Sequence, residues 1–596
     1  MNSFFFSFVF YLFSHASFSA ASTLVEESVH YTLAVGQGES STTITTFSPT
    51  PTTTTTIKIA VTADIGSSSL KADPKYTSFY DMKNFTTIFE KKISPVLPSK
   101  AARSEDSEIV ASSKPKKLGG TIPRGASPRG ASMTNESTFS SSFDFLAAQL
   151  KDVKYWIVFL SHADEDHINY LKKVFDKIEA KEKTRVFLVF GGEWFNSNST
   201  DAVRETFRFL YQNSKYVFPI YPYEDSKPAT QKVKEHIVES DTISAQDKRT
   251  FNVREKIKGI YLDEFHGKFF DPSEKKGLTD LYQQEYSEFI NNPSDKSFLE
   301  ENFLQNIYIW SLDHRLGDLN AQSLVFSQTV RSIGFTFVHT GDAEHSTFEK
   351  IRSVLGDNPT TTIDNIFDNT LVILQAMHHG SGAKANLSSA ALTLFRPHVC
   401  TFSAGTGTQH GHPSLDATDF YTNSLAPRGS EFWEKYHGTN HKDYHFYVFA
   451  KKQDGKSGKA LAIKPEKNKP LLLGTNTFGT IKFSKLGIAI PMIHIPGYRP
   501  YYLMHAYECS KKDGNDLPPK IKVQDLVKMN NDENEEYENE DFWEDLENYT
   551  MTLSEDKKLY ETDDKRYKLR IVEKKVPCSP NDWKYYFYVL KKEDSE

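Results

Sequence analysis

Short apolar runs that each end in a polar cluster are the clearest pattern along the chain. One run, residues 155–160, leads directly into residues 161–167, where two histidines and two nonadjacent aspartates lie within six positions. Apolar runs of this length predict buried strands. Four more runs have the same form, at residues 59–63, 335–338, 371–374 and 399–402. We expect their polar ends to gather as loops at one edge of a sheet, where a scaffold commonly holds a site.

The polar cluster at residues 162–167 has two interpretations. Asp164, Asp166 and His167 converge only if the chain turns sharply after the strand, and carboxylates this close together need a cation to offset their repulsion. The alternative is a helix start, with Asp164 or Asp166 as its cap and the other charges solvated. Clusters of His and Asp are typical of metal or catalytic sites, so we favour a metal site.

A helix is predicted directly after this cluster. Apolar residues recur there at three- and four-residue spacing, namely Ile168, Leu171, Val174, Phe175 and Ile178. That spacing places them on one face of a helix, which would pack against the sheet.

Seven polar and glycine-rich blocks stand in order along residues 29–450. They are Val35-Gly36-Gln37-Gly38-Glu39-Ser40, Asp64-Ile65-Gly66, His162-x-Asp164-x-Asp166-His167, Asn320-x-x-Ser323-Leu324-Val325, Thr340-Gly341-Asp342-Ala343-Glu344, His378-His379-Gly380-Ser381 and Gly411-His412-Pro413. In this order they resemble the metallo-β-lactamase-fold domain of ComEC-type competence proteins. The resemblance implies an α/β fold, an αββα sandwich of two mixed sheets with helices outside and two metal ions at one edge.

The resemblance also implies a set of site residues. The metal ligands would be His162, Asp164, Asp166, His167, Asp342 and His378. Asp342 would bridge two metals, and His378 would be the late histidine ligand because the apolar run reaches it first, with His379 as the alternative. Asp64 would support the ligands from an adjacent strand.

Two departures from the usual pattern of the superfamily bear on the metals. A histidine usually stands where Asp164 stands, and oxygen ligands also suit manganese or magnesium. Many relatives have a mid-chain histidine ligand, but the matching place here carries Asn320 and Ser323, so one site is short of a ligand. His314 is a candidate to compensate, and the alternative is an ordinary surface histidine. We expect two divalent ions, zinc first, with manganese or magnesium as alternatives.

The reaction that the resemblance implies is metal-assisted hydrolysis. A water between two divalent ions loses its proton near neutral pH and attacks an ester or phosphoester as hydroxide. Asp166 and Asp342 would orient it, and His412 would contact a phosphate or protonate a leaving oxygen. The alternatives for His412 are a third-site ligand or an ordinary loop residue. Gly36 and Gly38 suit a tight turn and have a structural role.

The function expected first is that of a metallo-β-lactamase superfamily hydrolase acting on phosphodiesters, because ComEC-type domains are thought to be nucleases. One alternative is hydrolysis of a small lactone, thioester or phosphoester, since a fold alone does not choose the substrate. Another is a noncatalytic metal-binding or interaction protein. The net charge of −7 and pI near 6.3 mean that a nucleic-acid substrate would need a local basic groove. No run of 18 apolar residues occurs, so no transmembrane helix is expected.

The N-terminal residues 1–21 contain a short apolar segment followed by small residues, which matches a signal peptide except that it lacks a preceding positive charge. We expect secretion or the secretory pathway if it is one. The alternative is an apolar element packed on the sandwich of a cytoplasmic protein.

The hydrolase domain is expected to span residues 29–455, with two insertions. The first, rich in Ser, Pro and Gly, is expected to be disordered, and the second to form a subdomain. An extension of unknown role, a solvated acidic linker and a small β-rich ending would follow. In chain order these five segments are residues 71–145, 195–305, 456–529, 530–547 and 548–596. The three cysteines are too few for a disulfide framework or a zinc cluster.

Overall fold

The computed structural model describes about half of the chain, and every structural statement below refers to that half. The described residues are 26–36, 38–48, 56–67, 85–91, 141–192, 200–213, 216–220, 306–311, 318–355, 359–367, 369–405, 412–423, 436–438, 446–451, 458–463, 469–491, 498–510, 520–522, 549–553, 559–565, 567–572 and 582–592.

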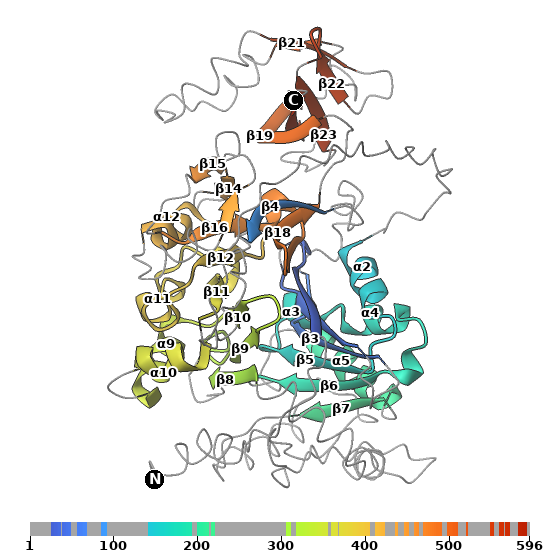
Figure 1. Ribbon diagram of the computed structural model, residues 1–596, viewed down its shortest axis with the longest axis vertical. Coiled ribbons are helices and arrows are strands. Elements are labelled where there is room, and N and C mark those ends of the chain that lie inside the picture. Colours follow the sequence, from blue (N-terminus) through green and yellow to red (C-terminus); the bar gives the residue numbers. More distant parts are fainter. Residues whose placement is uncertain are drawn as a thin grey trace, which may run out of the picture.

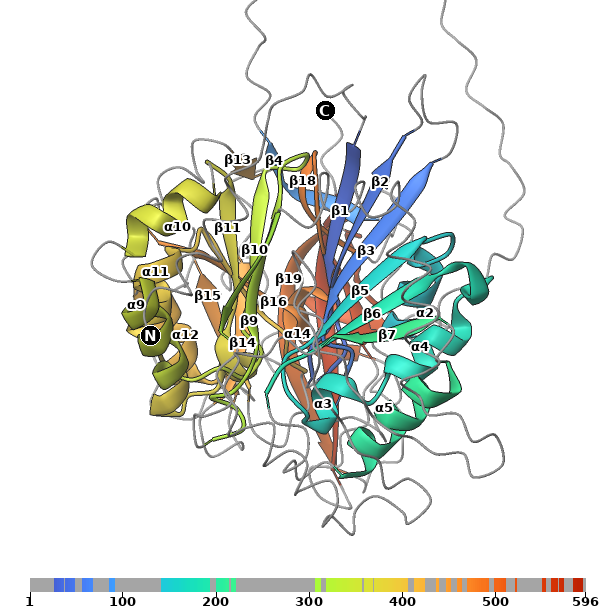
Figure 2. The same ribbon diagram turned by 90° about the horizontal axis from the view of Figure 1, so that it is seen from below.

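Two mixed β-sheets lie face to face (Figure 2). The first contains β1 (Glu26–Thr32), β2 (Ser41–Phe47), β3 (Ile57–Ala63), β4 (Phe85–Lys91), β5 (Tyr155–Leu160), β6 (Arg185–Phe190), β7 (Val217–Ile220), β13 (Tyr436–Gly438), β17 (Ile481–Ser484) and β18 (Gly487–Pro491). The second contains β8 (Ile307–Ser311), β9 (Val325–Val330), β10 (Phe335–His339), β11 (Leu371–Gln375), β12 (Val399–Phe402) and β16 (Leu471–Gly474). The orders are β13-β4-β18-β17-β1-β2-β3-β5-β6-β7 and β16-β12-β11-β10-β9-β8.

Helices cover the outer face of each sheet (Figure 2). Those beside the first sheet are α2 (Ser142–Gln149), α3 (Glu165–Ile168), α4 (Leu171–Lys177) and α5 (Thr200–Gln212). Those beside the second are α9 (His345–Leu355), α10 (Pro359–Phe367), α11 (Ser389–Phe395) and α12 (Leu415–Asn423). The order of layers, helix then sheet then sheet then helix, confirms the αββα sandwich that the sequence predicts.

All five apolar runs that predicted strands form strands of this sandwich. In the first sheet β3, β5 and β6 are parallel neighbours, and in the second β10, β11 and β12 are parallel neighbours. The carboxyl ends of these strands therefore share an edge in each sheet. The predicted helix is present as two short helices, α3 and α4, with Ile178 directly after α4, and all five of its apolar residues are buried in one hydrophobic core with the first sheet.

The sandwich continues beyond residue 455, where the sequence placed its end. Strand β16 pairs with β12, β17 pairs with β1, and β18 pairs with β4. The predicted domain end at residue 455 is too early. The prediction depends on polar motifs, and these short strands carry none. The sandwich extends to Pro491.

The two expected insertions also contribute strands to the first sheet and a helix beside it. Strand β4 lies within residues 71–145 and forms ladders with β18 and β13, so this part of the insertion is ordered. Helix α5 and strand β7 lie within residues 195–305, and β7 extends the sheet from β6. The expected signal peptide, the acidic linker and His314 lie outside the described residues.

The C-terminal strands form a third sheet (Figure 1). Its members are β19 (Tyr498–Ser510), β20 (Lys520–Lys522), β21 (Thr550–Leu553), β22 (Leu559–Thr562), β23 (Tyr567–Val572) and β24 (Asp582–Lys592). Strands β21 to β24 lie within residues 548–596, whereas β19 and β20 precede residue 548. A hairpin of β14 (Phe446–Lys451) and β15 (Gly458–Ile463) forms a separate two-stranded sheet, and β14 lies near β16 of the second sheet. Across the described ranges, no helix is both long and apolar enough to cross a membrane.

Candidate metal centre

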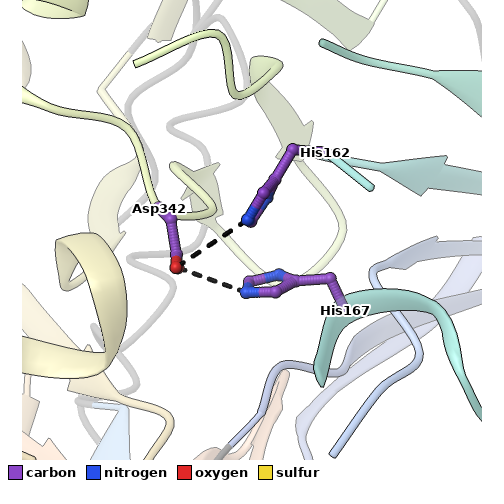
Figure 3. A group of neighbouring side chains, drawn as sticks. All are labelled: His162, His167 and Asp342. Carbon is purple, nitrogen blue, oxygen red and sulfur yellow. Dashed lines mark ion pairs between the residues drawn. The ribbon is translucent and has the colours of Figure 1, made fainter. Parts of the chain in front are cut away.

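The polar side chains that follow the parallel strands meet where the two sheets face each other. Residues after β5 supply His162 and His167, and the turn after β10 supplies Asp342. Figure 3 shows both imidazoles and the carboxylate pointing toward one another. The short helical turn Met377–Gly380 after β11 brings two further histidines to the same place. The site therefore joins both halves of the sandwich.

The two oxygens of Asp342 face different histidines. Its Oδ2 lies 3.4 Å from Nε2 of His378 and 3.8 Å from Nε2 of His162. Its Oδ1 lies 3.2 Å from Nε2 of His167 and 3.6 Å from Nε2 of His379. Asp342 thus lies between two pairs of imidazole nitrogens, as a bridging carboxylate would.

Two more carboxylates belong to the same centre. Asp164 Oδ2 lies 3.4 Å from Nε2 of His162. Asp166 Oδ2 lies 3.4 Å from Nε2 of His379, and its Oδ1 lies 4.0 Å from Nε2 of His167. Asp164 also precedes α3, but its side chain makes no capping hydrogen bond. The geometry therefore favours the metal interpretation of this cluster over the helix-cap interpretation.

Hydrogen bonds behind the histidines set which ring nitrogen faces the centre. His167 Nδ1 lies 2.9 Å from Oδ2 of Asp64, and the same carboxylate accepts from the backbone N–H and the hydroxyl of Ser161. His379 Nδ1 donates to the backbone carbonyl of Ser403 at 3.0 Å. With Nδ1 protonated in both rings, both Nε2 atoms present a lone pair to the centre, the arrangement of metal-binding histidines.

The centre contains buried polar atoms that have no hydrogen-bond partner among the described residues. These atoms are Nε2 of His162, His167 and His379, and Oδ1 of Asp342. Leaving such groups unsatisfied is costly, and native proteins rarely do it without a ligand or ion. Two groups have ligand atoms within 4.8 Å of one another, namely His162 with His167 and Asp342, and Asp166 with His167 and His379. Imidazoles and carboxylates so arranged fit divalent metal ions.

The electrostatics of the site are those of close, opposite charges. Burial would raise the pKa of Asp342, but the surrounding imidazoles, His378 first, hold it well below its usual range. Burial would lower the pKa of His167, but Asp342 and Asp64 raise it well above the ordinary value. The pKa of His379 is raised too, because Asp342 and Asp166 outweigh its burial. Cations are thus stabilised at the place where metal ions would lie.

Glu39 is a site residue that the sequence reading missed. Its side chain is buried, and neither oxygen makes a hydrogen bond within the described ranges. One of its oxygens lies within 4.8 Å of ligand atoms of Asp342 and His379. Burial, and then the charge of Asp64, raise the pKa of Glu39 to about 8. The available signal was an acidic residue in the block that contains Gly36 and Gly38, whose glycines alone were given a role.

The other predicted residues surround this centre. The amide Nδ2 of Asn320 lies 3.4 Å from Nδ1 of His378, and the hydroxyl of Ser323 lies 3.4 Å from Nδ1 of His162. His412 is buried, with its ring centroid 5.6 Å from that of His378 and 6.4 Å from that of His379. These three residues contact the histidines from outside the centre.

Comparisons with known proteins add little to this description. No protein-family model matches the chain, and no curated protein matches it. Among solved structures the chain is similar to a long form of RNase Z from yeast, at 13% sequence identity and a TM-score of 0.28. The match covers 65% of this chain and 38% of that chain. A TM-score this low does not establish a shared fold, so the αββα assignment depends on the sheets and helices themselves.

Proposed function

We propose that this protein is a metal-dependent hydrolase that holds two divalent ions and cleaves phosphodiesters. The observation that carries the proposal is the convergence on the Asp342 carboxylate of three Nε2 atoms that make no hydrogen bond, those of His167 and His379 facing Oδ1 and that of His162 facing Oδ2. A site built only for stability would pair these atoms with donors or acceptors. The order of the seven sequence blocks supports a relation to ComEC-type domains.

The residues divide the work of such a site between binding and orientation. Asp342, with its two oxygens facing different histidines, would bridge the ions. Asp166, on the rim between His167 and His379, would orient the attacking water through its free lone pairs. Divalent ions held here supply an activated water near neutral pH and stabilise charge that develops on the substrate. Zinc is the first choice for this mixed set, and the number of carboxylates also suits manganese or magnesium.

His412 would act on the substrate. It is buried beside His378 and His379, and it lies on the loop before α12, where a phosphate entering the centre would meet it. A histidine there would donate a hydrogen bond to a phosphate oxygen or a proton to the leaving oxygen. Nucleic acid or a smaller phosphodiester would then be the substrate.

The test combines metal content with hydrolysis. Metal per chain would be measured by mass spectrometry, and hydrolysis of bis-p-nitrophenyl phosphate before chelation, after it and after metal return. We expect about two metals per chain and activity that follows them. Asp166→Asn should lower turnover by roughly 100-fold or more, the effect of losing a group that orients the reacting water.

Asp176→Asn is the matched control, because Asp176 lies on α4 and pairs with Lys172 and Lys181 away from the centre. It should leave both metal content and turnover unchanged. No bound metal under replete conditions would overturn the proposal in favour of a noncatalytic protein. Metal-dependent hydrolysis of lactones or thioesters, without any of the phosphodiester, would overturn the substrate class.

A further inference from the structure

We infer that the two adjacent histidines belong to different metal sites, and that His378 takes the place of the missing mid-chain histidine. His378 would complete the site on the Oδ2 side of Asp342, and His379 the site on the Oδ1 side. This inference rests on the proposed metal-dependent function and assigns its ligands.

The first support is the division of contacts around Asp342. His378 reaches Oδ2, the oxygen that also faces His162, whereas His379 reaches Oδ1, the oxygen that also faces His167. The second contact of His379 is Asp166 at 3.4 Å. This assignment would give each side two imidazoles, the shared carboxylate of Asp342 and one further carboxylate, which is Asp164 on the Oδ2 side and Asp166 on the other.

The second support is the backbone that separates the two rings. His378 has φ 48° and ψ 53°, His379 has φ 55° and ψ 15°, and Gly380 has φ 83°. Left-handed conformations are unfavourable for a residue with a side chain and persist only where the surroundings fix them. This backbone turns the two rings to an interplanar angle of 85° with centroids 6.0 Å apart. Two consecutive strained histidines are explained if each must reach a different ion.

The third support is the environment of the His378 ring. His378 can bind a metal through Nε2 only if Nδ1 carries the proton and donates it. The side-chain amide of Asn386 lies 3.2 Å from this Nδ1, and that of Asn320 lies 3.4 Å from it. Oδ1 of Asn386 is buried and makes no hydrogen bond to any described residue. A half-turn of this amide, whose two ends are interchangeable in shape, places Oδ1 as the acceptor.

Ser323 explains why a substitute ligand is needed. It stands where the mid-chain histidine is expected, and its hydroxyl contacts Nδ1 of His162, on the side of the ring away from Asp342. Ser323 therefore supports His162 from behind and leaves the Oδ2 side without an imidazole from this block. His378 fills that position.

The test compares His378→Gly with His379→Gly. Glycine removes the ring and accepts the left-handed backbone without strain, so both variants are expected to fold. Native mass spectrometry and metal titration would count ions and measure each affinity. We expect each single variant to bind one ion instead of two and the double variant to bind none tightly. The control is His345→Ala on α9, which should keep two ions. Alanine is used at this position because glycine would weaken the helix.

The positioning role of Asn386 has its own readout. Asn386→Leu should lower the affinity for one of the two ions by about 10- to 100-fold, the usual effect of losing the partner of a ligating histidine. Asn386→Asp should restore that affinity, because a carboxylate accepts from Nδ1 of His378. A merely structural role would not distinguish these variants.

The outcomes separate this inference from the proposed function. Two ions retained in His378→Gly, or one ion retained in the double variant, would overturn the assignment while leaving the hydrolase proposal in place. A second outcome is that the wild-type protein binds two ions, that the variants lose them one by one as described, and that no ester is hydrolysed. This outcome would overturn the proposed function and uphold the ligand assignment. No ion in the wild-type protein would overturn both.

Discussion

The carboxylate of Asp64 holds the ring of His167, with Oδ2 of Asp64 2.9 Å from Nδ1 of His167. Asp64 follows β3 in a left-handed conformation, with φ 50°, and His167 lies in α3 after β5. The same carboxylate oxygen also accepts from the hydroxyl of Ser161, at 2.7 Å. This relationship decides which nitrogen of His167 faces Asp342.

Asp64→Asn is therefore expected to weaken metal binding with little change in the backbone, since asparagine tolerates a left-handed conformation. An amide NH₂ placed at Oδ2 meets the N–H of His167, so the ring must move its proton to Nε2, where a metal would bind. We expect a roughly 10- to 100-fold loss of metal affinity, measured by calorimetric titration. Equal affinity in the variant and the wild-type protein would show that Asp64 does not set the tautomer.

Glu39→Gln should change the stability of the chelated protein with a definite sign. The pKa of Glu39 is raised from 4.5 to about 8 by burial, so the folded state retains a proton that the unfolded state loses above pH 4.5. The wild-type protein therefore loses stability as the pH rises from 4.5 to 8, by about 3 kcal/mol at pH 7. Glutamine has no such loss.

The measurement is urea unfolding of both chelated proteins at pH 4.5 and pH 7. The advantage of the variant should grow by about 3 kcal/mol between the two pH values. Parallel behaviour would mean that Glu39 is ionised and compensated in the metal-free protein. With metal returned, the wild-type protein should bind it more tightly than Glu39→Gln, because a carboxylate near Asp342 and His379 attracts a cation.

Local signals explain how much of this molecule could be predicted from sequence. The apolar runs before Asp64, Ser161 and Asp342 are short and rich in β-branched and aromatic residues, and these features identify strands without knowledge of their neighbours. Polar residues at the ends of parallel strands are expected to meet at one edge. The gathering of the aspartates and histidines follows from these two facts, whereas the αββα layer order was implied by the resemblance to ComEC-type domains.

Long-range pairing explains what could not be predicted. Strand β17 joins the sheet because it pairs with β1, with Thr32 opposite Ile481, far apart in the chain. Nothing in residues 471–491 marks that partner. The different directions of His378 and His379 depend on two left-handed residues, a conformation that histidine rarely adopts and that its sequence does not signal. The approach of the Glu39 side chain to Asp342 and His379 likewise depends on the turn that contains Glu39.

Gly66→Ala should disrupt the centre through sterics alone. A Cβ at Gly66 would lie 2.1 Å from the backbone carbonyl carbon of Asp166 and 2.3 Å from the backbone nitrogen of His167. Backbone atoms cannot rotate away, so the metal-binding segment must move. We expect a loss of about 1–3 kcal/mol in the free energy of unfolding, together with loss of metal.

Gly334→Ala serves as the comparison for this variant. Gly334 has φ +78° and its Cβ would meet only the flexible Nζ of Lys91, at 3.4 Å. Gly334→Ala should lower the free energy of unfolding by about 1–2 kcal/mol through backbone strain, and the variant should keep its metals. If Gly66→Ala keeps its full metal content, Gly66 does not pack tightly against the Asp166–His167 backbone, whatever the stability of the variant.

Acid is expected to destabilise the sandwich through a second pair of histidines, which are not among the proposed metal ligands. His339 is buried at the end of β10, with Nδ1 3.2 Å from Oε1 of Gln375, and burial lowers its pKa to about 4. Its neighbour His30 stacks on Phe337 with ring centroids 3.6 Å apart, and burial and His339 lower the pKa of His30 as well. Above pH 6.5 both rings are neutral in the folded and unfolded states.

Between pH 6.5 and 4 the unfolded chain binds a proton at His339 that the folded protein does not. The free energy of unfolding should therefore fall as the pH drops through this window, by about 3 kcal/mol from His339. His339→Gln keeps a polar group near Gln375 but cannot titrate. Chelated wild-type and variant proteins would be unfolded in urea at several pH values, so that contributions shared by both, including those of His167 and His379, cancel. A difference that does not change with pH would show that His339 is not held neutral by the fold.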